Sequence, residues 1–290
     1  MGSLTALIPS SIKQKLKKKL VRTVYSATKP YNLVCMTEPE LTGKNAVITG
    51  GSGAIGRAIS FRLAAMGAVV YVGSRTEESA MKVVNEIRGA GLKAEPFIID
   101  VSSEESIEKE FDRVFNRATK LDILVNCAGG GARDGAKCLA LQRVETIDAV
   151  VNTNLRGTML CTRKAAQLMT PNRTGKIVII SSAVGLQGMA NYSEYSAAKA
   201  GMFGFMKSMA LELGPYDINV NCVTPGYIQR GEYDDNQKNM LLKTNAMRKI
   251  GTLEDVAAAV AFMVGKDSGF ITGQCLVVDG GRTLGLMGSR

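Results

Sequence analysis

The chain has 290 residues, of which 46% are hydrophobic and 21% charged, so it is long enough to bury a full core as one α/β domain. It contains no histidine, which excludes Ser-His-Asp triads, Cys-His dyads and the usual zinc sites. We therefore predict no metal site, and acid–base chemistry must use tyrosine, lysine, aspartate or glutamate.

The formal net charge of +10 is concentrated at the N-terminus. The first 30 residues contain no acid and seven of the basic side chains, which are Lys13, Lys15, Lys17, Lys18, Lys19, Arg22 and Lys29. The remaining residues carry only +3, and a body so nearly balanced has no broad basic surface for DNA or RNA. We expect no nucleic-acid partner.

Residues 1–40 are predicted to form a basic arm, and residues 41–290 the folded domain. Within the arm, residues 11–25 place apolar side chains four apart, so a helix here has a narrow apolar stripe opposite lysines. Two interpretations stay open, a peripheral contact with an anionic membrane and a solvated or subunit-packing arm. The six cysteines include no CxxC pair, which favours free thiols and a cytoplasmic location.

The rest of the chain alternates short apolar runs with helical stretches. Strands are expected at 46–50, 68–74, 94–100, 121–129, 176–182, 218–226 and 275–281, and helices near 54–67, 76–90, 103–117, 141–169, 193–213 and 253–264. Continuously apolar strands separated by helices predict a doubly wound parallel sheet of the Rossmann type, covered on both faces. Its ligand site should lie at the carboxyl ends of the strands.

A glycine-rich turn follows the first strand and leads into a helix. Glycine permits the tight turn, and the N–H groups of the helix start can bind a pyrophosphate. The residues predicted to contact a dinucleotide here are Gly50, Ser52, Gly53, Ile55 and Gly56. Arg57 and Ala58 stand where a P-loop needs lysine and serine or threonine, so a nucleotide triphosphatase is excluded.

The second strand ends in Ser74 and Arg75, without the acid that would bind a ribose 2′-hydroxyl. Arginine at that place can pair with a 2′-phosphate. NADP(H) is therefore the preferred cofactor, and NAD(H) stays an alternative.

Several motifs agree in order with the short-chain dehydrogenase/reductase family, which the chain resembles from about residue 41 to 285. Residues 49–56 match its TGxxxGxG turn, with Ala54 in place of the middle glycine, and residues 126–129 match its NNAG stretch, with Cys127 as a departure. The remaining matches, with the cofactor-binding neighbours that the resemblance implies, are Asp100, Val101, Asn126, Ala128, Gly129, Asn154, Ser182, Tyr195, Lys199, Pro225, Gly226 and Ile228.

Tyr195 and Lys199 are four residues apart, so they share one face of a helix. A free tyrosine, with a pKa of about 10, exchanges protons poorly near neutrality, and a close ammonium favours the phenolate. We predict that Tyr195 exchanges a proton with the substrate oxygen and that Ser182 holds that oxygen. The resemblance further implies that Lys199 binds the nicotinamide ribose and that Asn154 steadies a water relay. Tyr192 has a serine and no lysine four residues on, so it is interpreted as a substrate-side or packing residue. Ser181 lacks the family's spacing to Tyr195 and is interpreted as the structural member of its pair.

Residues 227–250 occupy the place of the family's substrate lid, and Arg230 stands where the family often has threonine. This arginine indicates either an acidic or phosphorylated substrate or a solvated lid residue. The resemblance is strongest to 3-oxoacyl-carrier-protein reductases, which implies an acyl thioester or other small-molecule substrate and a homodimer or homotetramer. The alternatives are a dehydrogenase of a sugar, polyol or steroid, and a non-catalytic NADP-binding scaffold or sensor.

Overall fold

The computed structural model describes residues 40–118, 120–130, 136–231 and 234–285. The predicted basic arm, including the stretch 11–25 and its interpretation as a membrane contact, lies outside the described residues. Among the helices that the described ranges contain, none has both the length and the apolar character needed to cross a membrane.

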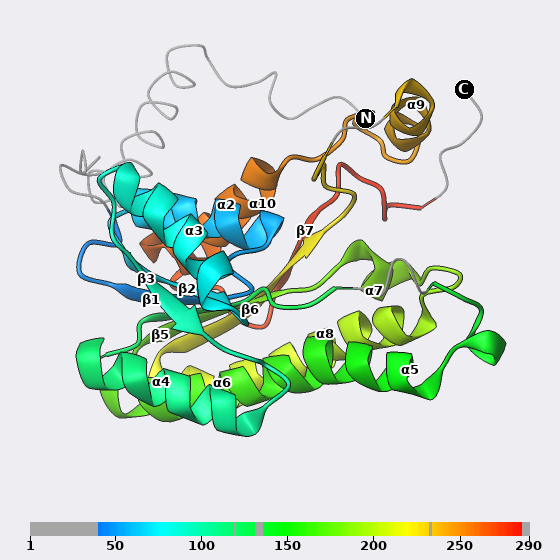
Figure 1. Cartoon of the computed structure of the whole chain (residues 1–290). Helices are drawn as coiled ribbons and strands as arrows, with labels where there is room; N and C mark the ends of the chain where they lie inside the picture. The colour runs from blue at the N-terminus through cyan, green and yellow to red at the C-terminus, as the bar shows by residue number, and fades with distance from the viewer. Residues whose placement is uncertain (1–39, 119, 131–135, 232–233, 286–290) are drawn as a thin grey trace, which may run out of the picture. The chain divides into compact units, whose positions relative to one another are not determined.

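Seven parallel strands form one sheet in the order β3-β2-β1-β4-β5-β6-β7 (Figure 1). Their bounds are β1 (Asn45–Thr49), β2 (Val69–Ser74), β3 (Ala94–Ile98), β4 (Ile123–Asn126), β5 (Gly175–Ile180), β6 (Ile218–Pro225) and β7 (Cys275–Val278). The chain reverses its direction of travel across the sheet between β1 and β4, which is the place where such sheets bind their ligands.

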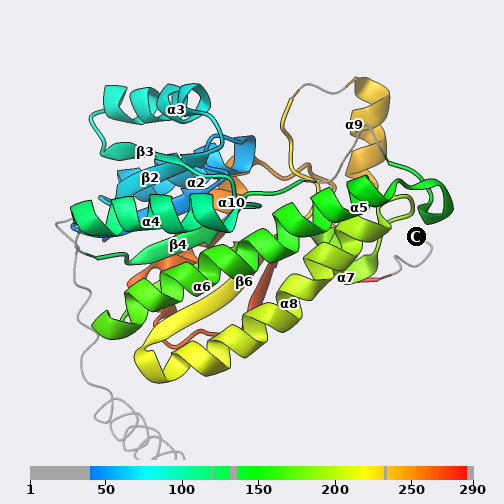
Figure 2. The same ribbon diagram turned by 60° about the horizontal axis from the view of Figure 1, so that its bottom comes forward.

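Helices cover both faces of the sheet, as Figures 1 and 2 show. One face carries α2 (Ala54–Ala65), α3 (Glu77–Gly89) and α10 (Leu253–Val264), and the other carries α4 (Glu104–Ala118), α6 (Gly157–Met169) and α8 (Ser193–Leu213). The prediction of a doubly wound α/β fold is confirmed.

Two hydrophobic cores lie on opposite sides of the sheet because side chains alternate along each strand. In β1, Ala46 and Ile48 pack toward α2 and α10, whereas Val47 between them packs toward α4 and α6. Met202 and Met206 of α8 are fully buried in the second core. These methionines are therefore packing residues.

The prediction of one continuous helix near 141–169 is wrong. The chain first forms η3 (Leu139–Leu141) and α5 (Val144–Val151), then a π-helical turn η4 (Asn152–Arg156), and only then α6. In this π turn the Asn154 side chain bonds both the Val150 carbonyl of the preceding turn and the backbone of Gly130 in the loop after β4. Apolar spacing reports only the helix face, so it cannot show such a turn.

Short elements complete the part of the chain that the structure describes. They are α7 (Ala183–Gln187), α9 (Asp235–Leu242), η5 (Thr170–Asn172), η6 (Gly214–Tyr216) and η7 (Lys266–Ser268). α7 follows β5 and α9 follows β6, so both lie at the carboxyl end of the sheet.

Candidate active site

A cavity of about 1080 Å³ opens at the carboxyl ends of the strands. The predicted residues that line it are Gly50, Ser52, Gly53, Ile55, Gly56, Ser74, Arg75, Asp100, Val101, Ala128, Gly129, Ser182, Tyr195, Lys199, Pro225 and Gly226. Three further predicted residues, Asn126, Asn154 and Ile228, are buried and do not line it. The fold therefore brings most of the predicted residues to one cavity and places the other three elsewhere.

The turn between β1 and α2 approaches its neighbours too closely for a side chain at two positions. A β-carbon on Gly56 would lie 2.1 Å from the carbonyl oxygen of Gly50, and one on Gly50 would lie 2.7 Å from the Ala128 Cα. Gly50 also has a φ of +64°, which glycine adopts without strain. The glycines thus keep this backbone bare at the start of α2.

Helix α2 begins after Gly53 without a side-chain cap and without an acid in its first turn. Its first N–H groups therefore face the cavity with the positive end of the helix dipole and no competing carboxylate. This bare turn and uncapped helix start fit the pyrophosphate of a dinucleotide.

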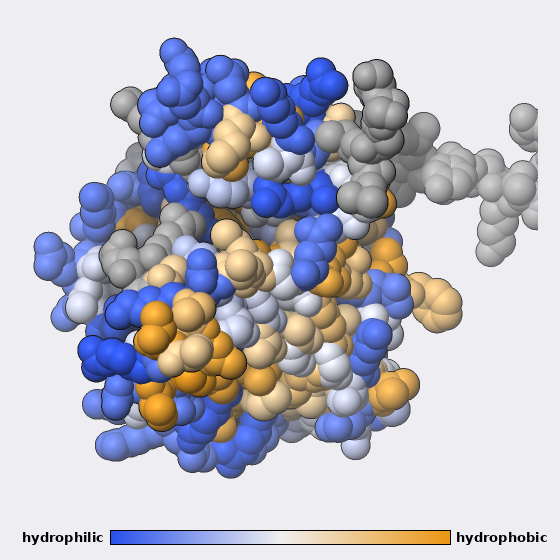
Figure 3. Space-filling model, turned by 90° about the vertical axis from the view of Figure 1, so that its right-hand side faces the viewer, coloured by the Kyte–Doolittle hydropathy of each residue, from blue (hydrophilic) through white to orange (hydrophobic). Residues whose placement is uncertain are grey.

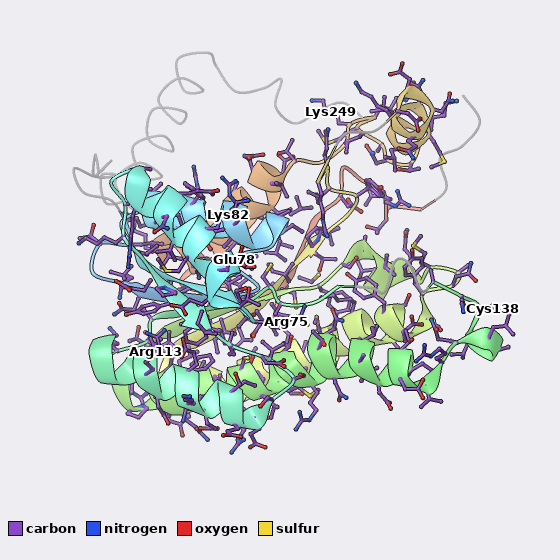
Figure 4. All side chains as sticks on the ribbon, in the orientation of Figure 1. Arg75, Glu78, Lys82, Arg113, Cys138 and Lys249 are labelled. Atoms are coloured by element: carbon purple, nitrogen blue, oxygen red, sulfur yellow. The ribbon has the colours of Figure 1, made fainter. Side chains whose placement is uncertain are left out.

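Beyond β2 the cavity wall is polar. Ser74, Arg75, Thr76 and Ser79 line it, and Figure 4 shows Arg75 at the turn below Glu78 and Lys82 of α3. Facing this turn, Asp100 accepts hydrogen bonds on Oδ1 from the amide and the hydroxyl of Ser102, at 2.9 and 2.7 Å. These bonds, helped by the charge of Arg75, lower the pKa of Asp100. This end of the cavity offers hydroxyls and one guanidinium to a ligand.

The loop after β4 is held from two sides. Thr49 Oγ1 accepts hydrogen bonds from the amides of Cys127 and Ala128, each at 3.1 Å. Asn154 donates to the carbonyl of Gly130 at 3.0 Å and accepts from its amide at 3.1 Å. Sequence reasoning missed Thr49, although its place directly before the glycine turn was the available signal.

Gly129 allows the close approach of this loop to η4. Its φ is +146°, and a β-carbon there would lie 2.3 Å from Asn154 Oδ1. The backbone carbonyl of Asn154 accepts a hydrogen bond of 2.6 Å from the Thr158 hydroxyl. The Asn154 side chain therefore fixes the cavity wall from behind, and its role in a water relay stays a prediction.

Tyr195 and Lys199 lie on α8 at the other end of the cavity, where Ser182 caps α7. The Lys199 ammonium nitrogen is 5.6 Å from the centre of the Tyr195 ring and donates to the carbonyl of Ile180 at 2.9 Å. Ser181 instead turns inward and donates to the carbonyl of Lys199 at 2.9 Å. Both serines line the cavity, but the Ser181 hydroxyl is engaged by the Lys199 backbone, whereas Ser182 lies beside the tyrosine and lysine without that bond.

Lys199 is buried beside two thiols and within reach of the charge of Arg230. Burial lowers its pKa to about 8, the thiols of Cys127 and Cys222 oppose that shift, and the charge of Arg230 adds to it. Desolvation likewise raises the pKa of the Cys127 thiol to about 11, against the charges of Lys199 and Arg230. An ammonium with a lowered pKa beside a phenol and a hydroxyl is a setting for proton transfer near neutral pH.

Sequence reasoning also missed cavity residues on and around α5. Arg143 directly before the helix, Glu145 and Thr146 in its first turn and Thr153 in η4 line the cavity. They belong to no motif, and only the packing of α5 beside α8 brings them there. Cys127 and Arg230, noted as departures from the family pattern, line the cavity as well.

Comparison with known proteins places this geometry in a family. A family model described as enoyl-(acyl carrier protein) reductase matches residues 50–283. The chain belongs to the short-chain dehydrogenase/reductase family. It is an NAD(P)-dependent short-chain oxidoreductase that acts on CH–OH groups. The predicted resemblance to this family is confirmed.

Three relatives show where in the family the similarity is concentrated. A 3-oxoacyl-[acyl-carrier-protein] reductase of Aquifex aeolicus is 37% identical over 84% of this chain and 99% of its own, and that of Thermotoga maritima is 33% identical over 83% and 98%. A (2S)-[(R)-hydroxy(phenyl)methyl]succinyl-CoA dehydrogenase subunit of Thauera aromatica is 34% identical over 82% and 96%.

Solved structures confirm the fold. A protein of Agrobacterium tumefaciens provisionally assigned as a gluconate dehydrogenase superposes with a TM-score of 0.81 at 29% identity, covering 85% of this chain and 98% of its own. A protein of Sinorhizobium meliloti provisionally assigned as a short-chain alcohol dehydrogenase gives a TM-score of 0.80 at 29% identity, over 85% and 99%.

Proposed function

We propose that the chain reduces the 3-oxo group of an acyl thioester to a secondary alcohol with NADPH. The observation that carries this proposal is the convergence of Ser182, Tyr195 and Lys199 at one end of a cavity whose other end fits a dinucleotide. When bound, the nicotinamide supplies the hydride. The side chains of this end supply the proton and hold the substrate.

In this proposal Tyr195 donates its phenolic proton to the carbonyl oxygen, and Ser182 donates a hydrogen bond to the same oxygen. Lys199 holds the ribose hydroxyls of the nicotinamide half and keeps a positive charge beside the phenol. Asn154 fixes the loop after β4, which forms the wall next to Lys199.

NADP(H) is favoured over NAD(H) because Ser74 and Arg75 at the end of β2 and Ser79 at the start of α3 line the cavity, where they can bind a 2′-phosphate. β2 itself ends without the carboxylate that would bind a ribose 2′-hydroxyl. The other predicted cofactor contacts belong to the same proposal, namely Asp100, Val101, Asn126, Ala128, Gly129, Pro225, Gly226 and Ile228.

An acyl substrate is favoured by the surface around the chemical end. Large apolar side chains are exposed on η3, at the start of α5 and around α7, namely Leu139, Leu141, Val144, Leu186 and Met189. Figure 3 shows hydrophobic side chains gathered on the face that carries these elements. The acyl chains of the carrier-protein and CoA substrates named in the relatives are apolar, and such a surface favours their binding. The gluconate dehydrogenase assignment of one structural neighbour favours the polar alternative, a sugar or polyol.

Assembly as a homodimer or homotetramer, with residues 41–290 as one catalytic domain, belongs to the same proposal. Its support is the family membership of the chain. Light scattering after size exclusion separates these states from a monomer.

The experiment follows NADPH absorbance with four candidate substrates. These are acetoacetyl-CoA, crotonyl-CoA as an enoyl thioester, a keto sugar and a steroid ketone. We expect turnover of acetoacetyl-CoA, which Tyr195→Phe lowers about 10²- to 10⁴-fold because the proton donor is lost. Tyr192→Phe is the matched control, since Tyr192 is close in sequence but does not line the cavity. A panel without turnover despite tight NADPH binding contradicts the proposal and favours a scaffold or sensor.

A further inference from the structure

Arg230 is held at the chemical end of the cavity by a short extended segment after β6. The Gln229 amide donates to the carbonyl of Gly251 at 2.8 Å, and the Gly251 amide donates to the carbonyl of Tyr227 at 3.2 Å. Side chains alternate along extended backbone, so Arg230 lies on the same side as the buried Ile228. Its side chain lines the cavity from there.

Neither of the two carboxylates in the cavity lining pairs with Arg230. They are Asp100, which is bonded to Ser102 at the opposite end, and Glu145, which pairs with Arg143 at 3.3 Å. Across the described ranges, no salt bridge includes Arg230. Its guanidinium therefore lines the cavity without a carboxylate partner among the described residues.

A second cation lies nearby. The charge of Arg230 reaches the Lys199 ammonium, where it disfavours the protonated form, and it reaches the Cys127 thiol, where it favours the thiolate. Two positive charges that act on the same few residues repel each other, and an anion bound between or beside them relieves that repulsion. The geometry therefore favours the binding of a negatively charged group close to the reacting carbonyl.

We infer that Arg230 binds an anionic oxygen group carried by the substrate. This inference deepens the proposed function and rests on it. The pyrophosphate of the dinucleotide is a poorer occupant because the bare turn and the start of α2 already offer it N–H groups at the other end. The planar guanidinium fits both a carboxylate and a phosphate, so the group comes either from a free oxo acid or from the phosphates of a thioester carrier.

Three substrates that share the same 3-oxo group distinguish a free oxo acid from a thioester carrier as the source of the anionic group. Acetoacetate carries a carboxylate, acetoacetyl-CoA carries carrier phosphates, and the acetoacetyl thioester of N-acetylcysteamine is uncharged. For Arg230→Met we expect kcat/KM to fall about tenfold or more for at least one charged substrate, because a charge-assisted contact is lost. The uncharged thioester should lose severalfold less kcat/KM than the affected charged substrate, and the Kd of NADPH should change less than about twofold. Arg230→Lys should restore part of the loss.

Lys249→Met is the matched control for net charge. Lys249 is exposed, belongs to the same segment after β6 and does not line the cavity, and Figure 4 shows it near α9. Equal losses for all three substrates, or a weakened Kd for NADPH, would overturn the inference, since Arg230 would then serve the cofactor or the fold. Unchanged kinetics for every substrate would overturn it too.

A measurement without turnover keeps this inference separate from the proposed function. Acetoacetate and CoA are each titrated by calorimetry into protein saturated with NADP⁺, in which no reduction takes place. Binding of either anion that Arg230→Met weakens about tenfold or more supports the inference, even if none of the three compounds is reduced. Binding that the substitution leaves unchanged, or no binding to the wild type, contradicts it.

Discussion

The two ends of the cavity differ in whether backbone or side-chain atoms form the site. At the dinucleotide end, bare backbone forms the site, and glycine is needed because a β-carbon would collide with backbone atoms. At the chemical end, side chains form the site, and their effect depends on burial and on neighbouring charge, as at Lys199. The first end is therefore sensitive to shape, whereas the second is sensitive to charge and protonation.

Adding one methyl group at the dinucleotide end tests its sensitivity to shape. In Gly56→Ala the new carbon would meet the carbonyl oxygen of Gly50 at 2.1 Å, so the turn must shift. We expect the free energy of unfolding to fall by about 1–3 kcal/mol, and NADPH affinity to fall with the displaced turn. Urea unfolding and titration of NADPH fluorescence measure the two effects.

The same substitution elsewhere should have the opposite sign. Gly89 ends α3, and a β-carbon there has no neighbour within 4 Å. Gly89→Ala should raise the free energy of unfolding by up to about 1 kcal/mol, with NADPH affinity unchanged. If both variants behaved alike, the contact at Gly56 would not be what makes this end sensitive to shape.

Arg75→Asp tests the one place where the dinucleotide end relies on charge. The aspartate would repel a 2′-phosphate and could accept a hydrogen bond from a ribose 2′-hydroxyl. We expect the ratio of kcat/KM for NADPH to that for NADH to fall about tenfold or more. Lys82→Met, on α3 close by in Figure 4 but outside the cavity lining, is the control for net charge. An unchanged ratio would place the 2′-phosphate elsewhere.

The sequence predicted the parts of the molecule that depend on local pattern. Apolar runs placed all seven strands, and the glycine turn marked the start of α2, because both signals lie within a few neighbouring residues. The spacing of Tyr195 and Lys199 likewise placed both on α8. The boundaries were less accurate, and the strand expected at 121–129 covers only Ile123–Asn126.

Long-range packing could not be predicted in the same way. The π-helical turn at Asn154 is stabilised by bonds to Gly130, 24 residues earlier, and no pattern within the helix indicates it. The entry of Arg143 and Glu145 into the cavity wall depends on how α5 lies beside α8. The lowered pKa of Lys199 depends on burial and on Arg230, which comes from a segment beyond β6.

Lys199 gives an effect on stability that depends on pH and that only the chemical end should show. Its pKa is about 8 in the folded protein against 10.5 for the ordinary side chain, so folding disfavours the ammonium. Below about pH 8 the buried charge destabilises the fold by up to about 3 kcal/mol. As the pH rises from about 8 to 10.5, the folded lysine is neutral while the unfolded one still binds a proton, so this destabilisation disappears.

Lys199→Met removes the charge and keeps most of the stem. At neutral pH the variant should be inactive yet more stable than the wild type by about 1–3 kcal/mol, after the lost bond to Ile180 is counted. The difference should shrink toward zero or change sign at roughly pH 10, where the wild-type lysine is neutral. Lys207→Met, at an exposed position of the same helix, is the control for the loss of one positive charge. A stability difference that stayed constant with pH would mean that Lys199 is not held against its charge, and the contrast between the two ends of the cavity would then rest on shape alone.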